Sequence, residues 1–204
     1  MHLKEELEKK FGTNCFEYGL FYHYENALRF ELSPPQSSSR IKSFLTAYNK
    51  AEEILNDIFH TNKLFTICLS FTGEKNLISN LTFFKNLKDN DIAIPKQVCY
   101  WTKIHKEENP ELEYRRCFLL FKSDDEDILY KLLWGSLAKD MYIFPRLYFD
   151  VYIYDLKKGI IVQPYDDRGM DIIGTNHTYM QNLYHKFSKY LFDHDMKKMV
   201  NAFE

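Results

Sequence analysis

Glycine is scarce in this sequence, with 7 residues among 204, and the glycine-rich motifs that bind phosphate groups are absent. Neither GxGxxG nor GxxxxGK occurs, which excludes a dinucleotide-binding loop or a P-loop of the usual kind. The GxSxG motif that marks the nucleophile of many hydrolases is also missing. The sequence therefore predicts no cofactor and indicates no catalytic residue of these classes.

Cysteine is sparse as well. Cys15, Cys68, Cys99 and Cys117 lie far apart and form no CxxC pair. Four dispersed cysteines in a chain of this length do not make a secreted disulfide framework, so we expect reduced, mostly buried thiols in the cytoplasm. The seven histidines form no HxH or HxxxH pair, and no zinc or other metal site is predicted.

The formal net charge of −2 lacks the excess of positive charge that holds most nucleic-acid-binding proteins to their ligand. The N-terminal segment 1–10 carries acids where a signal peptide has an uninterrupted apolar run. No segment approaches the roughly 18 apolar residues that cross a membrane. We expect a cytoplasmic protein that binds neither nucleic acid nor membrane.

Apolar residues make up 45% of the chain, and the 15 tyrosines and 17 phenylalanines predict a largely aromatic core. Alternation and short apolar runs predict six strands, at about 27–32, 63–71, 97–104, 112–121, 147–154 and 160–163. Helical spacing predicts helices at about 2–11, 40–60 and 77–87, two that begin at the capping boxes Ser123–Glu126 and Thr178–Gln181, and a short last one at 196–203. The pattern is typical of one α+β domain spanning 1–204, with a mixed or antiparallel sheet of about five to six strands and helices packed on it.

The most strand-like part of the chain is the predicted hairpin 147–163, in which Gly159 supplies the positive φ of a short turn. A polar loop, 164–171, follows it and concentrates charged side chains beside apolar strands. The candidate binding residues of this loop are Tyr165, Asp166, Asp167, Arg168 and Asp171.

Two interpretations of that loop remain open. Arg168 is suited to a bidentate pair with a carboxylate or phosphate of a ligand, and the aspartates are suited to a hard divalent ion. Alternatively, the segment is a tight turn in which Asp bonds its own backbone and Arg168 pairs locally with Asp171.

His194 is a further candidate binding residue because it lies between Asp193 and Asp195, which would raise its pKa and orient the ring. A solvated junction between two helices explains the same Asp-His-Asp sequence, and this second interpretation is favoured.

The string Tyr154–Gly174, YDLKKGIIVQPYDDRGMDIIG, resembles the signature of an uncharacterised domain family of Gram-positive bacteria. The continuation Leu183-Tyr184-His185-Lys186, with Leu191, Asp193, Asp195 and Phe203, agrees with it, so the resemblance covers about 148–203. Members of the family look like small cytosolic proteins, some of them encoded near toxin and immunity genes. No catalytic activity comes with the resemblance.

The resemblance implies a protein that binds another protein, as an immunity protein neutralises a toxin domain by covering it. Such toxin domains are often basic, and the acidic segment would complement them. The alternative is a small hydrolase or metal-dependent enzyme that uses Asp166, Asp167 and Asp171 together with His194. That alternative requires the carboxylates to converge in a concave pocket, so a binding protein is favoured over an enzyme.

Overall fold

The computed structural model describes residues 2–33, 39–60, 64–106 and 113–204. Its centre is a seven-stranded sheet in the order β1-β7-β6-β5-β2-β4-β3, in which every neighbouring pair is antiparallel. The strands are β1 (Ala27–Glu31), β2 (Phe65–Thr72), β3 (Cys99–Lys106), β4 (Glu113–Ser123), β5 (Asp150–Asp155), β6 (Ile160–Asp166) and β7 (Gly169–Gly174). The α+β class is confirmed, and the sheet has one strand more than the six that the sequence predicts.

The additional strand is β7, and the predicted polar loop 164–171 is divided between the end of β6, a short turn and the start of β7. β6 extends through Asp166, β7 begins at Gly169, and only the two residues between them form a turn. Expecting a loop there was therefore wrong. Most polar side chains of the segment belong to two paired strands. Buried aspartates are tolerated in these strands because other residues of the protein donate hydrogen bonds to them.

The predicted hairpin 147–163 is present as β5 and β6, although β5 begins at Asp150. Gly159 has a φ of 71° and donates its amide to the Asp155 carbonyl at 2.8 Å, as a tight turn requires. β5 is the fourth of seven strands, so this hairpin lies at the middle of the sheet.

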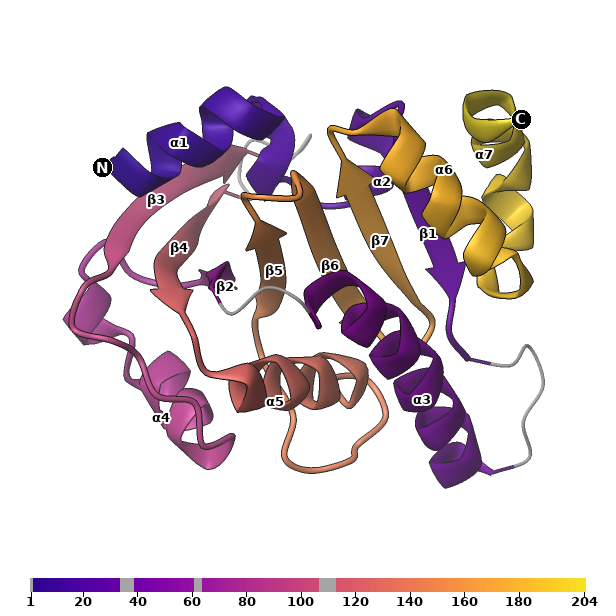
Figure 1. Cartoon of the computed structure of the whole chain (residues 1–204). Helices are drawn as coiled ribbons and strands as arrows, with labels where there is room; N and C mark the ends of the chain where they lie inside the picture. The colour runs from indigo at the N-terminus through magenta and orange to yellow at the C-terminus, as the bar shows by residue number, and fades with distance from the viewer. Residues whose placement is uncertain (1, 34–38, 61–63, 107–112) are drawn as a thin grey trace.

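Helical segments cover both faces of the sheet (Figure 1). The helices are α1 (His2–Phe11), α2 (Leu20–His23), α3 (Arg40–Phe59), α4 (Leu81–Asp89), α5 (Glu126–Leu137), α6 (His177–Lys186) and α7 (Met196–Phe203). None of the helices within the described ranges combines the length and apolarity needed to cross a membrane.

The first face of the sheet is covered by α1, α2 and the 3-10 turn η1 (Thr13–Phe16) between them. Tyr154 of β5 donates its hydroxyl to the Cys15 carbonyl at 2.8 Å, and Tyr152 donates to the Glu17 carbonyl at 3.1 Å. Because side chains alternate along a strand, these two tyrosines point to the same face. They tie the N-terminal segment to the central strand.

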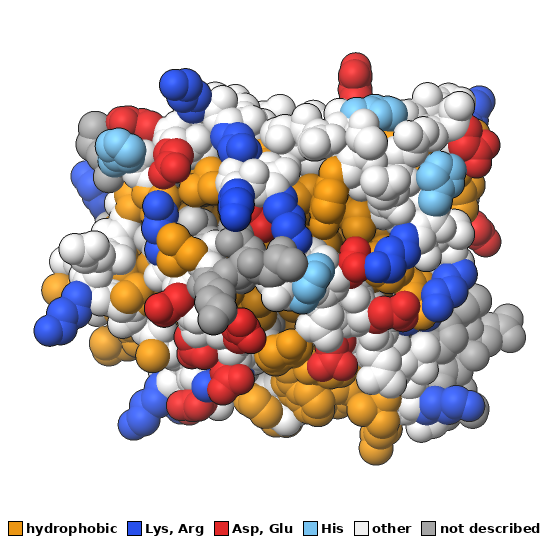
Figure 2. Space-filling view, viewed as in Figure 1, with side chains coloured by type: hydrophobic (Ala, Val, Ile, Leu, Met, Phe, Trp, Pro, Cys, Tyr) orange, Lys and Arg blue, Asp and Glu red, His pale blue; other side chains and the backbone are white. Residues whose placement is uncertain are grey.

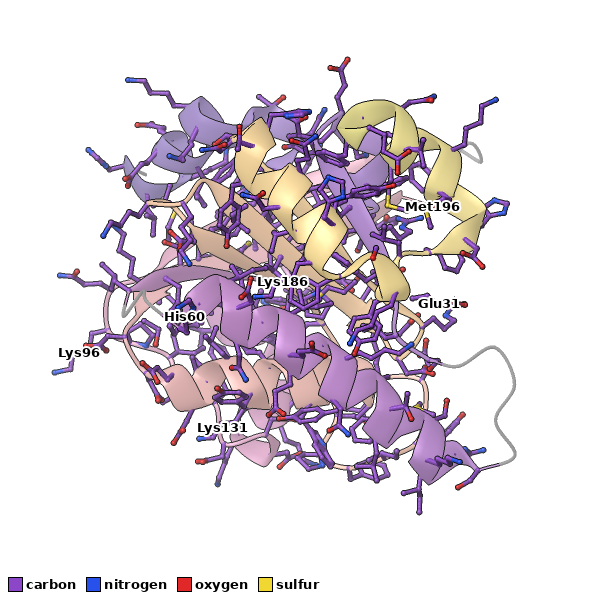
Figure 3. The ribbon with its side chains drawn as sticks, turned by 45° about the vertical axis from the view of Figure 1, so that its right-hand side comes forward. Glu31, His60, Lys96, Lys131, Lys186 and Met196 are labelled. Carbon is purple, nitrogen blue, oxygen red and sulfur yellow. The ribbon has the colours of Figure 1, made fainter. Side chains whose placement is uncertain are left out.

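The second face is covered by α3, α5 and α6. α5 contacts β5 and β6 and packs along α3. Figure 3 shows α3 and α6 side by side, with Lys186 directed towards the last turn of α3, where its ammonium donates to Asp57. The ring of Phe187, which follows α6, meets Phe30 of β1 edge-on at 6.4 Å. The core between these layers is the continuous aromatic and aliphatic cluster that the composition predicts.

Both predicted capping boxes lie at helix starts, but other residues act as the caps. Asp125 caps α5 by accepting the Asp127 amide at 3.0 Å, whereas Ser123 accepts the amide of Asp125. Asn176 caps α6 by accepting the Tyr179 amide at 3.1 Å. Ser123 lies two residues before the cap of α5, and Thr178 lies two residues after the cap of α6, inside the helix. Each capping box was therefore misplaced by two residues.

The cysteines are free and mostly buried, as expected. Burial raises the pKa of the Cys15 thiol to about 12, and it raises that of Cys68 well above the ordinary value. Both thiols are therefore protonated near neutral pH, which leaves them unreactive as nucleophiles.

Candidate functional site

The turn between β6 and β7 consists of Asp167 and Arg168 and is held by local hydrogen bonds. Asp166 accepts the backbone amide of Arg168 at 2.8 Å and its guanidinium at 3.0 and 2.5 Å. The Asp166 side chain is only 6% exposed, whereas that of Arg168 is 75% exposed. The hydrogen bond and charge of Asp166 raise the pKa of Arg168. Arg168 therefore pairs locally, as the turn interpretation predicted, but with Asp166 and not with Asp171.

Asp167 has a different partner. Ser33, directly after β1, donates its hydroxyl to the Asp167 carboxylate at 2.6 Å and lies 2.8 Å from the Asp167 carbonyl oxygen. The amide of Leu32 donates to the Arg168 carbonyl at 2.9 Å. These bonds attach the β6–β7 turn to the end of β1.

Asp171 is fully buried and faces β1. Its carboxylate accepts two hydrogen bonds from Arg29, at 2.8 and 2.9 Å, and one from the Phe21 amide at 3.1 Å. Arg29 also donates to Asp195 at 3.1 Å and to the Tyr22 hydroxyl at 2.7 Å. Burial alone would lower the pKa of Arg29, but the bonds to Asp171 outweigh it, and the net direction is upward. Each nitrogen of this guanidinium already has an acceptor within the protein, so we assign the cluster a structural role.

Tyr165 and His194 lie near the Arg29 cluster without joining the turn residues. The Tyr165 ring centroid is 5.8 Å from the Arg29 guanidinium, and burial raises the pKa of its hydroxyl. His194 is exposed in the short 3-10 turn η4 (Asp193–Asp195) before α7, beside a hollow of about 390 Å³. It thus lies at a junction between two helical segments, while its neighbour Asp195 turns inward to Arg29.

The three aspartates of the predicted loop do not converge. Asp166 bonds within the turn, Asp167 bonds Ser33, and Asp171 points into the protein towards α2. In the parts of the chain that the structure describes, no three His, Cys, Asp or Glu side chains come together as a metal site. The convergence that the hydrolase alternative requires is therefore not formed by these residues.

A second arginine, Arg116 of β4, is completely buried and was not among the sequence candidates. It donates to Ser70 at 2.7 Å and to the Tyr152 hydroxyl at 2.6 Å, and the Tyr18 ring covers it at 3.7 Å. Glu17 lies 3.6 Å from its Nη1 atom. Its place in the strand pattern, between Arg115 and Cys117, gave no sign that it points inward.

A different group of side chains has the composition of a binding surface. Between α5 and β5, the chain exposes three aromatic residues around one arginine. Tyr142 is 69%, Phe144 68% and Tyr148 56% exposed, and their ring centroids lie 4.8 to 5.1 Å from the Arg146 guanidinium. We call Tyr142, Phe144, Arg146 and Tyr148 the aromatic surface. Beside it is a hollow of about 390 Å³ that Asn86 and Asp89 of α4 also line.

The backbone of the aromatic surface is fixed by buried amides. Asn86 and Asn90 both donate to the Arg146 carbonyl, at 2.9 and 3.1 Å, and Asn86 accepts the Tyr148 amide at 3.0 Å. Tyr142 adopts a φ of 55°, a left-handed conformation that costs a bulky residue energy and persists only when its surroundings impose it. The aromatic side chains are thus presented by an ordered backbone.

The aromatic surface and the β6–β7 turn lie at the same end of the sheet. β5 begins where the antiparallel β6 ends, so the segment before β5 and the turn after β6 are neighbours. Asp140 is close enough to contribute to the raised pKa of Arg168, and the Arg40 guanidinium of α3 lies 6.0 Å from the Tyr142 ring. Figure 2 shows hydrophobic side chains gathered along the lower edge of the molecule, beneath α5. Ile41 and Leu45 of α3 are also exposed, at 67% and 46%.

No sequence pattern marked the aromatic surface, because an aromatic residue in a core-rich sequence is normally assigned to the interior. The sequence offered one clue, the crowding of Tyr142 and Phe144 beside Pro145 and Arg146 just before the predicted strand 147–154, although Tyr148 falls inside that strand.

Fold and surface together define an α+β protein with a seven-stranded antiparallel sheet and an ordered aromatic surface at one end. The chain belongs to the family described as a domain of unknown function (DUF3885), whose model matches residues 3–195. The match extends far beyond the C-terminal segment 148–203 that carried the resemblance in the sequence. Searches of curated proteins and of solved structures find no match.

Proposed function

We propose that this protein acts by binding another protein, and that the aromatic surface forms the centre of the contact. The observation that carries the proposal is the exposure of Tyr142, Phe144 and Tyr148 around Arg146. Tyrosine and arginine are enriched among the residues that dominate binding energy, and a cluster of exposed apolar side chains is a common mark of an interaction site.

The ordered backbone supports the same proposal. A segment that is already fixed before binding loses little conformational entropy when a partner docks, and the bonds from Asn86 and Asn90 provide that order. The strained Tyr142 backbone is consistent with this role, because strain concentrates at functional positions.

Charged residues around the aromatic surface would set specificity and association rate. Asp89 and Asp140 are exposed beside it, and Asp167 is partly exposed in the β6–β7 turn, with Arg168 next to it. The acids would complement a basic partner, and reversing their charge should slow association most strongly at low salt. In this proposal Asp166 and Asp171 maintain the fold, while Asp167 and Arg168 lie at the border of the contact.

We further propose, on the resemblance of the C-terminal segment, that the partner is a basic toxin domain and that the protein neutralises it in the cytoplasm as an immunity protein. An aromatic surface bordered by acids could cover a basic active site without any catalytic step of its own.

The test begins with affinity capture from a lysate of the native cell, followed by binding kinetics with the purified partner. The variant Phe144→Ala with Tyr148→Ala removes two central side chains. The matched control, Leu64→Ala, removes a side chain of similar exposure (54%) at the start of β2, which is the opposite end of the sheet.

We expect the double variant to bind roughly 30-fold or more weakly, since truncating central residues costs about 2 kcal/mol or more. The control should bind as the unmodified protein does, and both should retain the melting temperature within a few degrees. Unchanged affinity of the double variant would refute the proposed surface. A partner without toxicity in cells that lack this protein would refute the immunity role and leave the surface intact.

A further inference from the structure

The two edge strands of the sheet, β1 and β3, differ in whether another segment bonds to their outer side. The outer edge of β1 is closed by the chain itself: Leu191 forms a bridge with Phe30, and the Phe192 amide donates to the Arg29 carbonyl at 2.9 Å. β3 is the opposite edge, eight residues long. Among the residues that the structure describes, no segment pairs with its outer side, and Figure 1 shows it at the margin of the sheet.

An unpaired edge of this length presents a row of backbone N–H and C=O groups to solvent, and such an edge can accept an added strand. β3 carries apolar and aromatic side chains as well as lysines. Ile104 is 48% exposed, and Tyr100, Trp101 and Thr102 are partly exposed. The charge of Lys103 is largely taken up by Glu17, which accepts a hydrogen bond from it at 2.5 Å.

A hollow of about 820 Å³ opens beside the start of β3, between the first turns of α1 and the segment 95–98. Its apolar lining comes from Leu3, Val98, Cys99 and Leu120. The volume is within the range of about 300–1,000 Å³ that is common for ligand pockets, and it is ample for one large side chain.

The charged residues of the hollow are predominantly basic. Lys96 and Lys122 line it, and Glu6 is the one acid among the described lining residues. Glu6 is 3.8 Å from Lys122 and so balances that ammonium in part. Lys96 is exposed at the rim. An acidic group entering the hollow would therefore be favoured over a basic one.

We propose that the outer edge of β3 receives an extended acidic peptide segment of a partner, which adds to the sheet as an eighth strand. Backbone hydrogen bonds to β3 hold the segment in register. One of its apolar side chains enters the hollow beside α1, and flanking Asp or Glu side chains face Lys96 and Lys122. Side chains alternate along an added strand, so acidic and apolar residues two positions apart reach the same side of the sheet.

The charges of β3 argue against a second copy of this chain as the occupant. The strand contains no acid, so β3 of a second copy would bring no partner for Lys96 and Lys122 at the hollow. This site is separate from the aromatic surface, which lies beyond the start of β5.

The test uses a library of fluorescein-labelled heptapeptides in which position 4 is Leu, Ile, Val or Phe. Positions 2 and 6, which share its side of an extended strand, are Asp or Glu. Binding to the intact chain is measured by fluorescence polarisation. Two peptide controls accompany the best binder: the same peptide with alternate backbone amides methylated, and the same peptide with every acid replaced by Lys.

We expect dissociation constants below about 1 mM for the best members, at least tenfold weaker binding for the methylated peptide, and none for the lysine peptide. Val98→Trp, which fills the hollow from a position 37% exposed, should weaken binding about tenfold or more, as should Lys96→Glu. Phe144→Ala should have no effect, which separates this site from the aromatic surface. Binding should also slow hydrogen exchange of β3 amides.

Three results would each overturn the proposal. They are the absence of any library member binding below about 1 mM, equal binding of the methylated peptide, and unchanged binding by Val98→Trp. Sedimentation that shows a dimer sensitive to Val98→Trp would assign the edge to a second copy and overturn it as well.

Discussion

Arg29 of β1 and Asp171 of β7 stand directly opposite each other in the strand register, and two hydrogen bonds of 2.8 and 2.9 Å join their buried side chains. Removing one partner leaves the other charged and desolvated. We expect Asp171→Asn to lower the free energy of unfolding by about 3 kcal/mol or more, as measured by urea denaturation. The double variant Arg29→Met with Asp171→Asn should lose much less than the sum of the two single losses. Additive losses would show that the pair is not coupled.

Asp166 and Asp167 are adjacent acids with different roles, and single substitutions should separate them. Asp166→Ala removes the acceptor of the Arg168 amide from a buried position, which should cost about 1–3 kcal/mol. Asp167→Ala loses a bond to Ser33 in a partly exposed position and should cost about 1 kcal/mol or less. Denaturation midpoints measure both, and equal costs would contradict the assignment of Asp166 to the fold.

Glu17 should make stability depend on pH in the acid range. Burial alone would raise the pKa of Glu17. The hydrogen bond and charge of Lys103, together with the charge of Arg116, outweigh burial, so the pKa lies below its ordinary value of 4.5. A carboxyl whose pKa is depressed by folding stabilises the protein above its unfolded pKa, and that contribution disappears as the pH falls through its folded pKa. Melting temperatures between pH 7 and pH 3 should fall less steeply below about pH 4.5 for Glu17→Gln than for the unmodified protein. Parallel curves would exclude the effect.

Asn86 should control the order of the aromatic surface. Asn86→Ala removes both the donor to the Arg146 carbonyl and the acceptor of the Tyr148 amide, from a position only 4% exposed. We expect a loss of about 1–3 kcal/mol and faster hydrogen exchange of the Tyr148 amide. Thr46→Ala on an exposed turn of α3 is the control, because its hydroxyl bonds only within its own helix. Unchanged exchange at Tyr148 would show that other contacts fix the segment.

Hydrogen exchange should also rank the strands by their place in the sheet. The central strands β2, β5 and β6 are paired on both sides and buried, so their amides should be among the last to exchange. The amides of β3 that face away from β4 should exchange early. Fast exchange in the β5–β6 hairpin would contradict its central position.

Local patterns were sufficient for most of the elements. The helix 40–60 and the strand at 63–71 were predicted within a few residues because apolar periodicity there follows the structure directly. β7 was missed because Asp171 interrupts its apolar sequence. Only pairing with Arg29, 142 residues away, makes that position favourable for a strand, and no local pattern records such a partner.

The candidate residues failed to converge for a related physical reason. Sequence proximity put Asp166, Asp167 and Asp171 together, but alternation along β6 and β7, with the turn between them, sends the three carboxylates in different directions. The aromatic surface could not be predicted from the sequence because contacts distant in sequence decide which side chains are exposed. Whether Phe144 is inside or outside depends on the bonds that Asn86 and Asn90 make to the backbone, more than 50 residues away in sequence.

The pairing of β1 with β7 has a consequence for how the chain is made. At roughly 5–20 residues per second, the ribosome completes β7 on the order of ten seconds after β1. During that interval Arg29 has neither Asp171 nor Asp195, and the edge of β1 lacks the segment around Leu191 that later closes it. Until the segment through Asp195 has been made, the nascent chain therefore lacks the acidic partners of Arg29 and the cover of the β1 edge, and an unpaired strand edge can pair with a neighbouring chain.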